Sequence, residues 1–435
     1  MSLLPTDRTP LLQNGNGAHR PNSWAGRIAT AIKAEGEPSW PASCKYFVFG
    51  SYINVLLVFL PLAGVAHYLN WDAGIRFAFS FISIMPLAAL LGRATDELSI
   101  PLGGTWSGLL NATFGNAVEI IVGIAALLND EIRIVQTSLL GSILSNLLLV
   151  FGCSFIAGTH VGPELNLNAG AGQMSSLMTL SCITLVIPAA YHSAKSHAGS
   201  IGGESKSYPD VVDGTDLDEV YGNGLNVLSR GASILLLLVY VTFLVFQLKT
   251  HKHLFKESDQ STQNSQHSNQ SSNEPVDQEE QVAHMNTISA GLGLLIVTLV
   301  TSFCADWLVA SIEETSERYH IPKPFIGLIL LPIVSNAAEH VTAVWMSLKG
   351  KIDMAVTICV GSSIQIAAFA LPLLVIVGWI THHNLTLFFA DFETIVLFVS
   401  VILVNSLVQD GKTNYMEGIM LITLYLIIAL AFWVS

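Results

Sequence analysis

The amino-acid sequence predicts an all-α membrane protein with about eleven transmembrane helices, built as two inverted five-helix repeats behind one extra N-terminal helix. Three observations support this prediction: an apolar composition, eleven apolar stretches of membrane-spanning length, and a polar motif that occurs twice. Of the 435 residues, 51% are hydrophobic and only 12% are charged, whereas soluble domains carry about 25% charged residues. The composition therefore indicates a membrane protein.

Apolar stretches long enough to cross a hydrocarbon core of ~30 Å as helices recur along the whole chain. We place them at residues 46–66, 74–92, 105–128, 134–158, 173–191, 226–249, 286–311, 324–348, 353–380, 386–408 and 415–434. Helices are expected rather than a closed barrel, because the strands of a barrel alternate polar and apolar residues and these stretches do not.

The polar segments between these stretches divide the chain into five parts. They are a cytosolic N-terminal tail (1–44), the extra first helix (45–72), the first repeat (73–249), a polar and acidic cytosolic linker (250–285) and the second repeat (286–435). Loops on the N-terminal side hold twelve Lys and Arg residues and the opposite loops hold seven. The positive-inside rule thus predicts a cytosolic N-terminus, and eleven crossings then place the C-terminus on the far side of the membrane.

One stretch, TFGNAVEIIVGIAALL at 113–128, carries Glu119 in the middle of an otherwise apolar helix. An ionised side chain at bilayer depth costs at least ~2.5–3.5 kcal/mol on insertion scales. A chain that keeps such a residue must compensate for this cost. We therefore treat Glu119 as a functional-site candidate; a structural ion pair or interhelical hydrogen bond is the alternative.

The same motif returns in the second half of the chain, as SNAAEHVTAVWMSL at 335–348. A shift of 220 positions aligns Asn116 and Glu119 with Asn336 and Glu339, and eight of the 27 positions in 116–142 are identical to their counterparts. The two copies lie five crossings apart, so they enter the membrane from opposite sides. Inverted repeats of this kind are typical of secondary transporters, whose substrate site lies near the midplane where the copies meet.

The motif combines residues that suit a hard cation. Asn and Glu three positions apart share one helix face, and the Gly or Ser before each pair permits a close approach or a break. Two such faces bring carboxylate and amide oxygens together, and Ca²⁺ prefers 6–8 oxygen ligands. The expected cation-binding residues are Gly115, Asn116, Glu119, Ser335, Asn336 and Glu339 in the motifs, and Ser142, Ser362, Ser363 and Gln365 in the following helices. Ser145 and Asn146, in the same GSILSN segment as Ser142, add further oxygen ligands.

The paired carboxylates also suggest proton exchange. A desolvated carboxyl group that lacks its cation favours the neutral, protonated form, and a divalent cation displaces that proton. Glu119 and Glu339 would then bind either H⁺ or metal, which is the coupling of an antiporter. His340, Asp306 and Glu97 are further candidates for a proton path or gate; packing or helix-end roles suit them equally well, and the Asn, Ser and Gln side chains could also serve as polar contacts between helices.

Several segments resemble the Ca²⁺/H⁺ exchangers of the cation/proton exchanger family, in its fungal vacuolar branch. They are GNAVEIIVGIAAL, SNAAEHVTAV, LSRGASILLLLVY with FQLKTH, GSSIQIA and DGKTNYMEG. The resemblance extends from about residue 45 to residue 434 and implies eleven spans, cation binding by the two motif helices and Ca²⁺ movement from the cytosol into an acidic vacuole. Ser335 departs from the family, which commonly has Gly there.

Two further expectations concern the polar segments. The resemblance implies a regulatory acidic stretch in the linker, matched here by Glu274, Asp277, Glu279 and Glu280. In the N-terminal tail, Asp7, Leu11 and Leu12 of DRTPLL have the acid-x-x-x-Leu-Leu form of a signal read by a sorting adaptor, an address rather than an anchor. Patterns this short also arise by chance.

The competing functions are a Na⁺-driven Ca²⁺ exchanger of the same superfold and a cation channel. Acidic rings select cations in channels, but an inverted pair of motifs fits alternating access better. An enzyme is not expected, because no intramembrane nucleophile set or metal-binding His motif is present.

The five cysteines form no C-x-x-C and predict neither disulfides nor a zinc site. The expected partners are Ca²⁺, H⁺ and the lipid bilayer, without cofactor or nucleic acid; stoichiometry, a preference between Ca²⁺ and Mn²⁺, and oligomeric state stay open.

Overall fold

The computed structural model describes residues 38–102, 104–167, 170–201, 215–251 and 283–434. The sorting sequence at 7–12 and the acidic segment at 274–281 lie outside these residues. The described chain is almost entirely helical, in agreement with the predicted fold class.

The N-terminal part and the first half contain the following elements. They are α2 (Trp40–Phe49), η1 (Tyr52–Val58), α3 (Phe59–Tyr68), α4 (Ala73–Leu102), α5 (Gly104–Phe114), α6 (Ala117–Leu128), α7 (Ile132–Leu144), the π-helical turn η2 (Ser145–Val150), α8 (Phe151–Gly158), β1 (Leu165–Asn166), α9 (Gly170–Ile201), α10 (Thr215–Val245) and the π-helical turn η3 (Phe246–Thr250).

The second half follows the same plan. It contains α12 (Thr287–Tyr319), α13 (Lys323–Phe325), the π-helical turn η4 (Ile326–Leu330), α14 (Leu331–Ser335), α15 (Ala337–Leu348), α16 (Ile352–Gln365), the π-helical turn η5 (Ile366–Ala370), α17 (Leu371–Ile380), α18 (Asp391–Gln409), β2 (Lys412–Thr413) and α19 (Tyr415–Val434). The two short strands pair antiparallel, with Leu165 opposite Thr413.

Each of the eleven predicted stretches falls on one of these helices or on a run of consecutive helical elements. Within the described residues, eight helices are long and apolar enough to cross a membrane, or up to ten when each of two bent pairs counts as one span. The bends are 85° between α2 and the η1–α3 segment, and 56° between the segment Lys323–Ser335 and α15. The stretch 105–128 is divided between the shorter helices α5 and α6. Eleven crossings therefore stays a prediction.

The internal repeat is visible in where the helices break. Helices α6 and α15 are both 12 residues long and begin directly after Asn116 and Asn336. The helix that follows each of them contains a π-helical turn, η2 or η5, at nearly the same register. Discontinuous helices at equivalent places in two halves are a feature of transporter binding sites.

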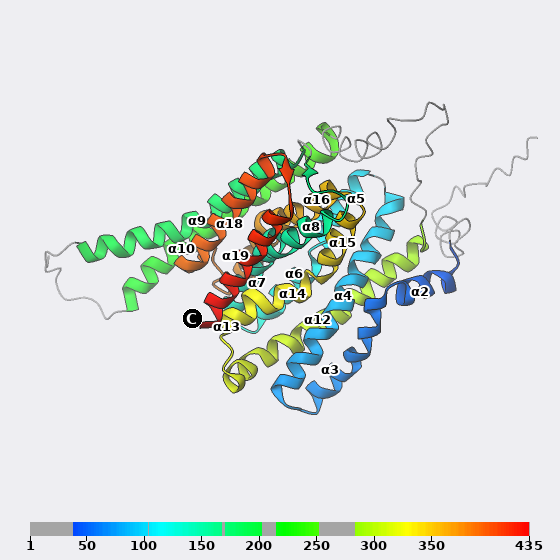
Figure 1. Ribbon diagram of the computed structural model, residues 1–435. Coiled ribbons are helices and arrows are strands. Elements are labelled where there is room, and N and C mark those ends of the chain that lie inside the picture. Colours follow the sequence, from blue (N-terminus) through cyan, green and yellow to red (C-terminus); the bar gives the residue numbers. More distant parts are fainter. Residues whose placement is uncertain (1–37, 103, 168–169, 202–214, 252–282, 435) are drawn as a thin grey trace, which may run out of the picture.

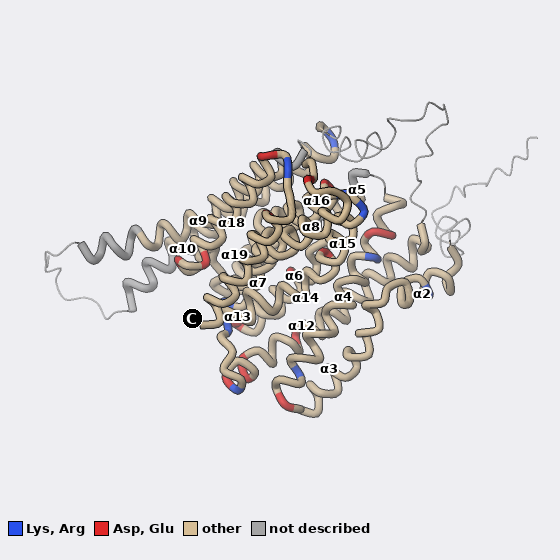
Figure 2. The backbone as a smooth tube through the Cα atoms, viewed as in Figure 1, with Lys and Arg blue, Asp and Glu red and all other residues tan. Residues whose placement is uncertain are grey.

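The segment Ile132–Gly158, which comprises α7, η2 and α8, is the most deeply buried of the candidate spans. It is buried on nearly all sides, as expected for a helix surrounded by other helices. Figure 1 shows it in the middle of the molecule, with α9, α10 and α18 on one side and α3, α4 and α12 on the other. Charged residues lie mostly toward the helix ends, as Figure 2 shows.

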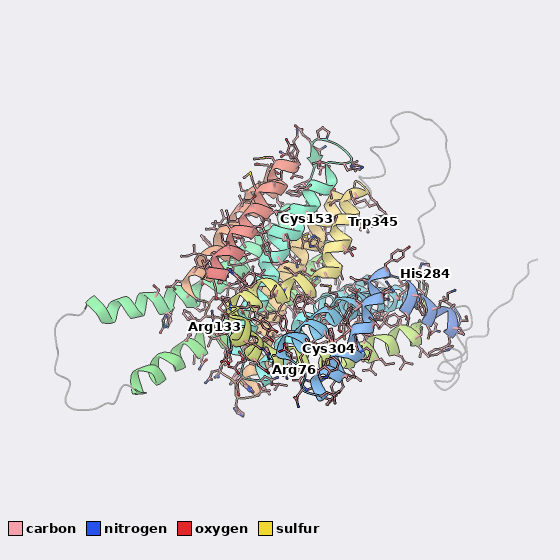
Figure 3. All side chains as sticks on the ribbon, turned by 60° about the horizontal axis from the view of Figure 1, so that its bottom comes forward. Arg76, Arg133, Cys153, His284, Cys304 and Trp345 are labelled. Atoms are coloured by element: carbon pink, nitrogen blue, oxygen red, sulfur yellow. The ribbon has the colours of Figure 1, made fainter. Side chains whose placement is uncertain are left out.

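The two ends of the bundle differ in their charged contacts. We call the end where α10 finishes and α12 begins the linker face; it includes the β1–β2 pair. The other end, which we call the ion-pair face, carries most of the salt bridges. They are Arg76–Glu314, Arg133–Glu393, Arg318–Asp72, Lys323–Glu131 and Lys323–Glu313. In Figure 3, Arg76 and Arg133 lie away from Cys153 and Trp345, which belong to helices that end at the linker face.

Helix α19 crosses α8 through two glycines. A Cβ atom at Gly418 would lie 2.7 Å from the carbonyl oxygen of Gly152, and one at Gly152 would lie 2.8 Å from that of Gly418. Small residues that let two backbones approach this closely are a common way to hold helices together in membranes.

We expect Gly418→Val to loosen this crossing and to lower the thermal unfolding temperature of the purified protein in detergent by several degrees. Overpacking of this kind costs about 1–3 kcal/mol. The matched control is Gly231→Val, since a Cβ at Gly231 has no neighbour within 4 Å. Equal unfolding temperatures for the two variants would contradict the assignment.

Candidate functional site

Both copies of the motif sit where a helix is interrupted. Gly115 and Asn116 separate α5 from α6, and the Gly115 N–H donates to the carbonyl of Asn111 at 2.8 Å. A Cβ at Gly115 would lie 2.5 Å from that carbonyl oxygen, so the close turn requires glycine. In the second copy, Ser335 is the last residue of α14 and Asn336 precedes α15. Neither Asn caps its own helix with its side chain, so both amides are available to other partners.

The first motif reaches across to the helix that follows the second motif. The Asn116 amide nitrogen donates to Oε1 of Gln365, and the Ser362 hydroxyl donates to Oδ1 of Asn116 at 3.1 Å. Both partners are on α16. Both the nitrogen and the oxygen of the Asn116 amide therefore contact the opposite repeat.

The second motif makes the reciprocal contact with α7. Nδ2 of Asn336 donates to the backbone carbonyl of Ser142 at 3.2 Å, and the hydroxyls of Ser142 and Ser335 lie 3.5 Å apart. Each motif thus contacts the helix that follows the other motif, as expected for a pseudo-twofold arrangement of the halves.

The two carboxyl groups lie in different surroundings. Glu119 is buried, with 8% of its surface exposed, and the hydroxyl of Ser335 is beside its carboxyl group. Glu339 is partly exposed; its Oε2 accepts from Nδ2 of Asn146 at 2.9 Å, and Ser362 is also beside it. The two acids are close enough to repel each other when both are charged.

In the part of the chain that the structure describes, the larger of the two spaces at the site lies toward the linker face. A cavity of about 360 Å³ reaches Glu339, Ser362 and Gln365 and is also lined by Asp96 and Gln247, near the linker-face ends of α4 and η3. The space beside Glu119 is about 20 Å³, lined mostly by apolar side chains together with three serines. A space of that size holds about one water molecule.

Asp96, in the wall of the open cavity, is a residue that the sequence did not single out. Its neighbour Glu97 was the candidate, but the Glu97 carboxylate accepts the backbone N–H groups of His284 at 2.9 Å and Met285 at 3.0 Å, just before α12. Adjacent residues point about 100° apart on a helix. Only the packing of α4 decides which of the two acids faces the cavity.

The other candidates lie away from the two cavities. Asp306 is exposed on α12 and accepts from Nδ2 of Asn129 at 3.1 Å. His340 is partly buried on α15, one residue after Glu339. The Ser363 hydroxyl donates to the carbonyl of Cys359 within α16, at 2.8 Å. A proton path or gate through Glu97, Asp306 or His340 stays a prediction.

The residues in the described part of the chain hold no group of three or more His, Cys, Asp and Glu side chains that could bind a metal ion. The site instead combines two carboxyl groups with amide and hydroxyl oxygens. Such a set suits a hard cation, with fewer charged ligands than a resident metal centre usually has.

Inverted halves, helices broken at a polar motif and a central acidic site together define a secondary transporter. The sodium/calcium exchanger protein family model matches residues 73–249 and 289–434. The chain is 44% identical over 391 residues to the vacuolar calcium ion transporter of Schizosaccharomyces pombe, covering 89% of this chain and 86% of that protein. It is 39% identical to vacuolar cation/proton exchanger 2 of Oryza sativa subsp. japonica, covering 90% and 84%.

The fold is shared with a solved exchanger as well. The structure of native YfkE, a Ca²⁺/H⁺ antiporter, matches with a TM-score of 0.68 and 31% identity, covering 88% of this chain and all of that one. The chain therefore belongs to the cation/proton exchangers within the sodium/calcium exchanger protein family. The family resemblance and the fold class predicted from the sequence are confirmed.

The one-sided cavity predicts one-sided labelling. In a variant without the five native cysteines, Thr357→Cys in the cavity wall should react with a charged thiol reagent added at the linker face. Ser138→Cys, beside the small enclosed space, should stay unlabelled. Mass spectrometry of inside-out and right-side-out vesicles measures both. Equal labelling of the two positions would contradict the assignment of an open and a closed side.

Proposed function

We propose that the protein exchanges cytosolic Ca²⁺ for luminal H⁺ across the membrane of an acidic organelle, by alternating access. The observation that carries this proposal is the convergence of two acidic motifs from inverted halves, one of whose carboxyl groups faces an open cavity. The relatives named as a vacuolar calcium ion transporter and a vacuolar cation/proton exchanger support Ca²⁺ and H⁺ as the exchanged ions.

The proposed Ca²⁺ ligands are the oxygens that the two halves bring together. They are the carboxylates of Glu119 and Glu339, the side-chain oxygens of Asn116, Asn336, Ser142, Ser335, Ser362 and Gln365, and the backbone carbonyl of Gly115. Ca²⁺ takes 6–8 oxygens, and water from the cavity can complete its shell. Ser363, whose hydroxyl donates to the carbonyl of Cys359 within its own helix, stays an expectation from the sequence.

Competition for the two carboxyl groups would couple the fluxes. Without a cation, two neighbouring carboxylates in an apolar environment repel each other, and a proton relieves that repulsion. Ca²⁺ relieves it as well, so the two ions exclude each other. When the lumen is one pH unit more acidic than the cytosol, each proton that moves out to the cytosol releases ~1.4 kcal/mol of free energy. This free energy can drive Ca²⁺ from the cytosol into the lumen.

The proposed location is the vacuolar membrane, with the N-terminus in the cytosol. Two relatives carry the word vacuolar in their names, and the distribution of Lys and Arg favours this orientation. The linker face, and the open cavity with it, would then face the cytosol. We keep the adaptor signal at Asp7, Leu11 and Leu12, and regulation by the acidic linker segment, as proposals from the sequence.

The decisive test removes one carboxylate at a time. Glu119→Gln and Glu339→Gln change a charge with little change in volume, and each should abolish ⁴⁵Ca²⁺ uptake driven by a pH gradient in reconstituted vesicles. Asp410→Asn is the matched control, because Asp410 is exposed in the turn before β2 and outside the cavity. Near-normal uptake by either well-folded glutamine variant would refute the role of the pair.

The same vesicles distinguish transport coupled to H⁺ from transport coupled to Na⁺. Coupling to Na⁺ is the alternative because the matching family model is that of the sodium/calcium exchanger proteins. Uptake should follow the pH gradient and stay unchanged when Na⁺ replaces an inert cation. Uptake that requires a Na⁺ gradient would favour the Na⁺-driven exchanger instead.

The inverted repeat also suggests how access changes sides. Gly141 lies directly against the backbone of η4, where a Cβ would be 2.1 Å from the carbonyl oxygen of Leu328. Gly361, its counterpart after the shift of 220, lines the open cavity, and the nearest neighbour of a Cβ there is Met174 Cε at 3.2 Å. In the opposite state the two glycines would exchange roles, so that α5 closes onto Gly361 and η4 leaves Gly141.

A larger residue at Gly361 should hold the cavity open. We expect Gly361→Val to keep equilibrium ⁴⁵Ca²⁺ binding in detergent close to that of the wild type but to reduce exchange in vesicles at least ~10-fold, a barrier increase of about 1.4 kcal/mol. Gly291→Val is the control, since a Cβ there has no neighbour within 4 Å. Normal exchange by Gly361→Val would rule out closure at this position.

A further inference from the structure

Helix α2 is turned by 85° from the η1–α3 segment that follows it. Ser51, between the two, has an extended backbone with φ −143° and ψ 140°. The buried amide of Asn54 holds the bend, because its Nδ2 donates to the carbonyls of Phe47 at 3.1 Å and Val48 at 2.8 Å. Carbonyl groups in the last turn of a helix lack partners within that helix. The bend is therefore a built feature of the chain.

The η1–α3 segment is long enough to cross the membrane without α2. It has seven residues in η1 and ten in α3. At rises of ~2.0 Å and ~1.5 Å per residue these give a length of ~29 Å, and the hydrocarbon core is ~30 Å thick. The chain reaches the ion-pair face directly after α3, where Asp72 pairs with Arg318. Helix α2 is thus left outside the core, at the opposite end.

Helix α4 marks the level at which α2 lies. No charged residue occurs in α4 between Arg76 and Arg93. Nη1 of Arg93 donates to the carbonyl of Phe47 at 2.9 Å and to that of Tyr46 at 3.3 Å. Charged side chains near the ends of membrane helices reach to the interface. The last turn of α2 therefore lies where α4 leaves the hydrocarbon core.

The two faces of α2 differ in their surroundings. Ser43, Tyr46 and Phe47 share one face and are buried or half-buried. Phe49 is 79% exposed, and the exposed surface continues into η1 at Tyr52. The exposed residues of α2 itself include Pro41, Cys44, Lys45, Val48 and Phe49. Apolar side chains beside a lysine are what a helix lying on a membrane presents to lipid.

The packed face of α2 joins it to the ends of α4 and α12. The backbone N–H of Asn286 donates to Oγ of Ser43 at 3.0 Å. The rings of His284 and Tyr46 are stacked with their centroids 4.8 Å apart, and Figure 3 shows His284 beside α2. The backbone N–H of His284 also donates to Glu97, which is next in sequence to the α4 acid in the cavity wall.

We propose that α2 is an interfacial helix that binds the phospholipid surface at the linker face. Val48 and Phe49 enter the boundary between headgroups and acyl chains, and Lys45 lies among the phosphate groups. Because α2 is joined to the end of α4, the lipid surface also holds in place one wall of the open cavity. The inference does not depend on which ions the protein exchanges.

Cys44, on the exposed face of α2, is a native labelling position. In a Cys153→Ser variant the other three cysteines are buried, so a fluorescent maleimide should label Cys44 alone. The full-length protein is placed in phosphatidylcholine vesicles that carry a nitroxide in the headgroup, near the top of the acyl chain or near its end. We expect the two shallow nitroxides to quench at least ~2-fold more than the deep one, because interfacial helices lie ~5–10 Å into the boundary.

Two further positions calibrate the measurement. Val58→Cys, in a variant that also carries Cys44→Ser and Cys153→Ser, places the label on an exposed side chain in the middle of the η1–α3 crossing. This label should be quenched most by the deep nitroxide. Asp410→Cys in the same background lies in the exposed turn before β2 and should be quenched by iodide in the water.

A single substitution tests whether the apolar face makes the contact. Phe49→Asp should raise iodide quenching of the Cys44 label at least ~2-fold, because a charged residue resists entry into the boundary. Phe49→Leu keeps an apolar side chain and should leave the quenching unchanged. If Phe49→Asp does not fold, the depth profile of the Cys44 label decides by itself.

Three results would overturn the proposal. Strongest quenching of the Cys44 label by the deep nitroxide would place α2 inside the core as part of the first crossing. Quenching by iodide alone would place it in water. Quenching by neither would mean that protein, such as a second copy of this chain, covers the exposed face.

Discussion

The structure depends on keeping two carboxyl groups inside an apolar helix bundle. Each of them costs at least ~2.5–3.5 kcal/mol at bilayer depth, and the chain offsets this with polar side chains from the opposite half. Ser335 lies beside Glu119, and Asn146 donates to Glu339. Because each acid relies on at least one side chain from the other half, the two halves must meet at the site.

The helix breaks at Asn116 and Asn336 also help to join the two halves. If either Asn capped its own helix, its side-chain oxygen would accept a hydrogen bond from a backbone N–H group of the first turn. Here both side chains bond instead to residues more than a hundred positions away in the sequence, on α16 and α7. The motif thus ties the two halves together at the point where their acids lie.

The two halves repeat in sequence but not in environment. One conformation of an inverted repeat must place equivalent residues differently, or both ends would be open or closed together. Gly141 is pressed against a backbone, whereas Gly361 faces a cavity. Glu119 and Glu339 differ in the same way. The proposed alternating access requires such a difference between equivalent residues in each of its two states.

The sequence by itself determined the helix positions, the doubled motif and the family. These depend on local features: runs of apolar residues, a 220-residue shift, and an Asn and a Glu on one helix face. It also predicted that Asn116, Ser142, Ser335, Ser362 and Gln365 would converge with the two acids, and the structure brings them together; their part in transport stays a proposal.

Only the tertiary structure decided that Asp96 rather than Glu97 lines the cavity, that Asp306 lies apart from it, and that the Asn146 amide turns its nitrogen to Glu339. Those outcomes depend on how each helix is rotated against neighbours that are distant in the chain, and no local pattern encodes that rotation.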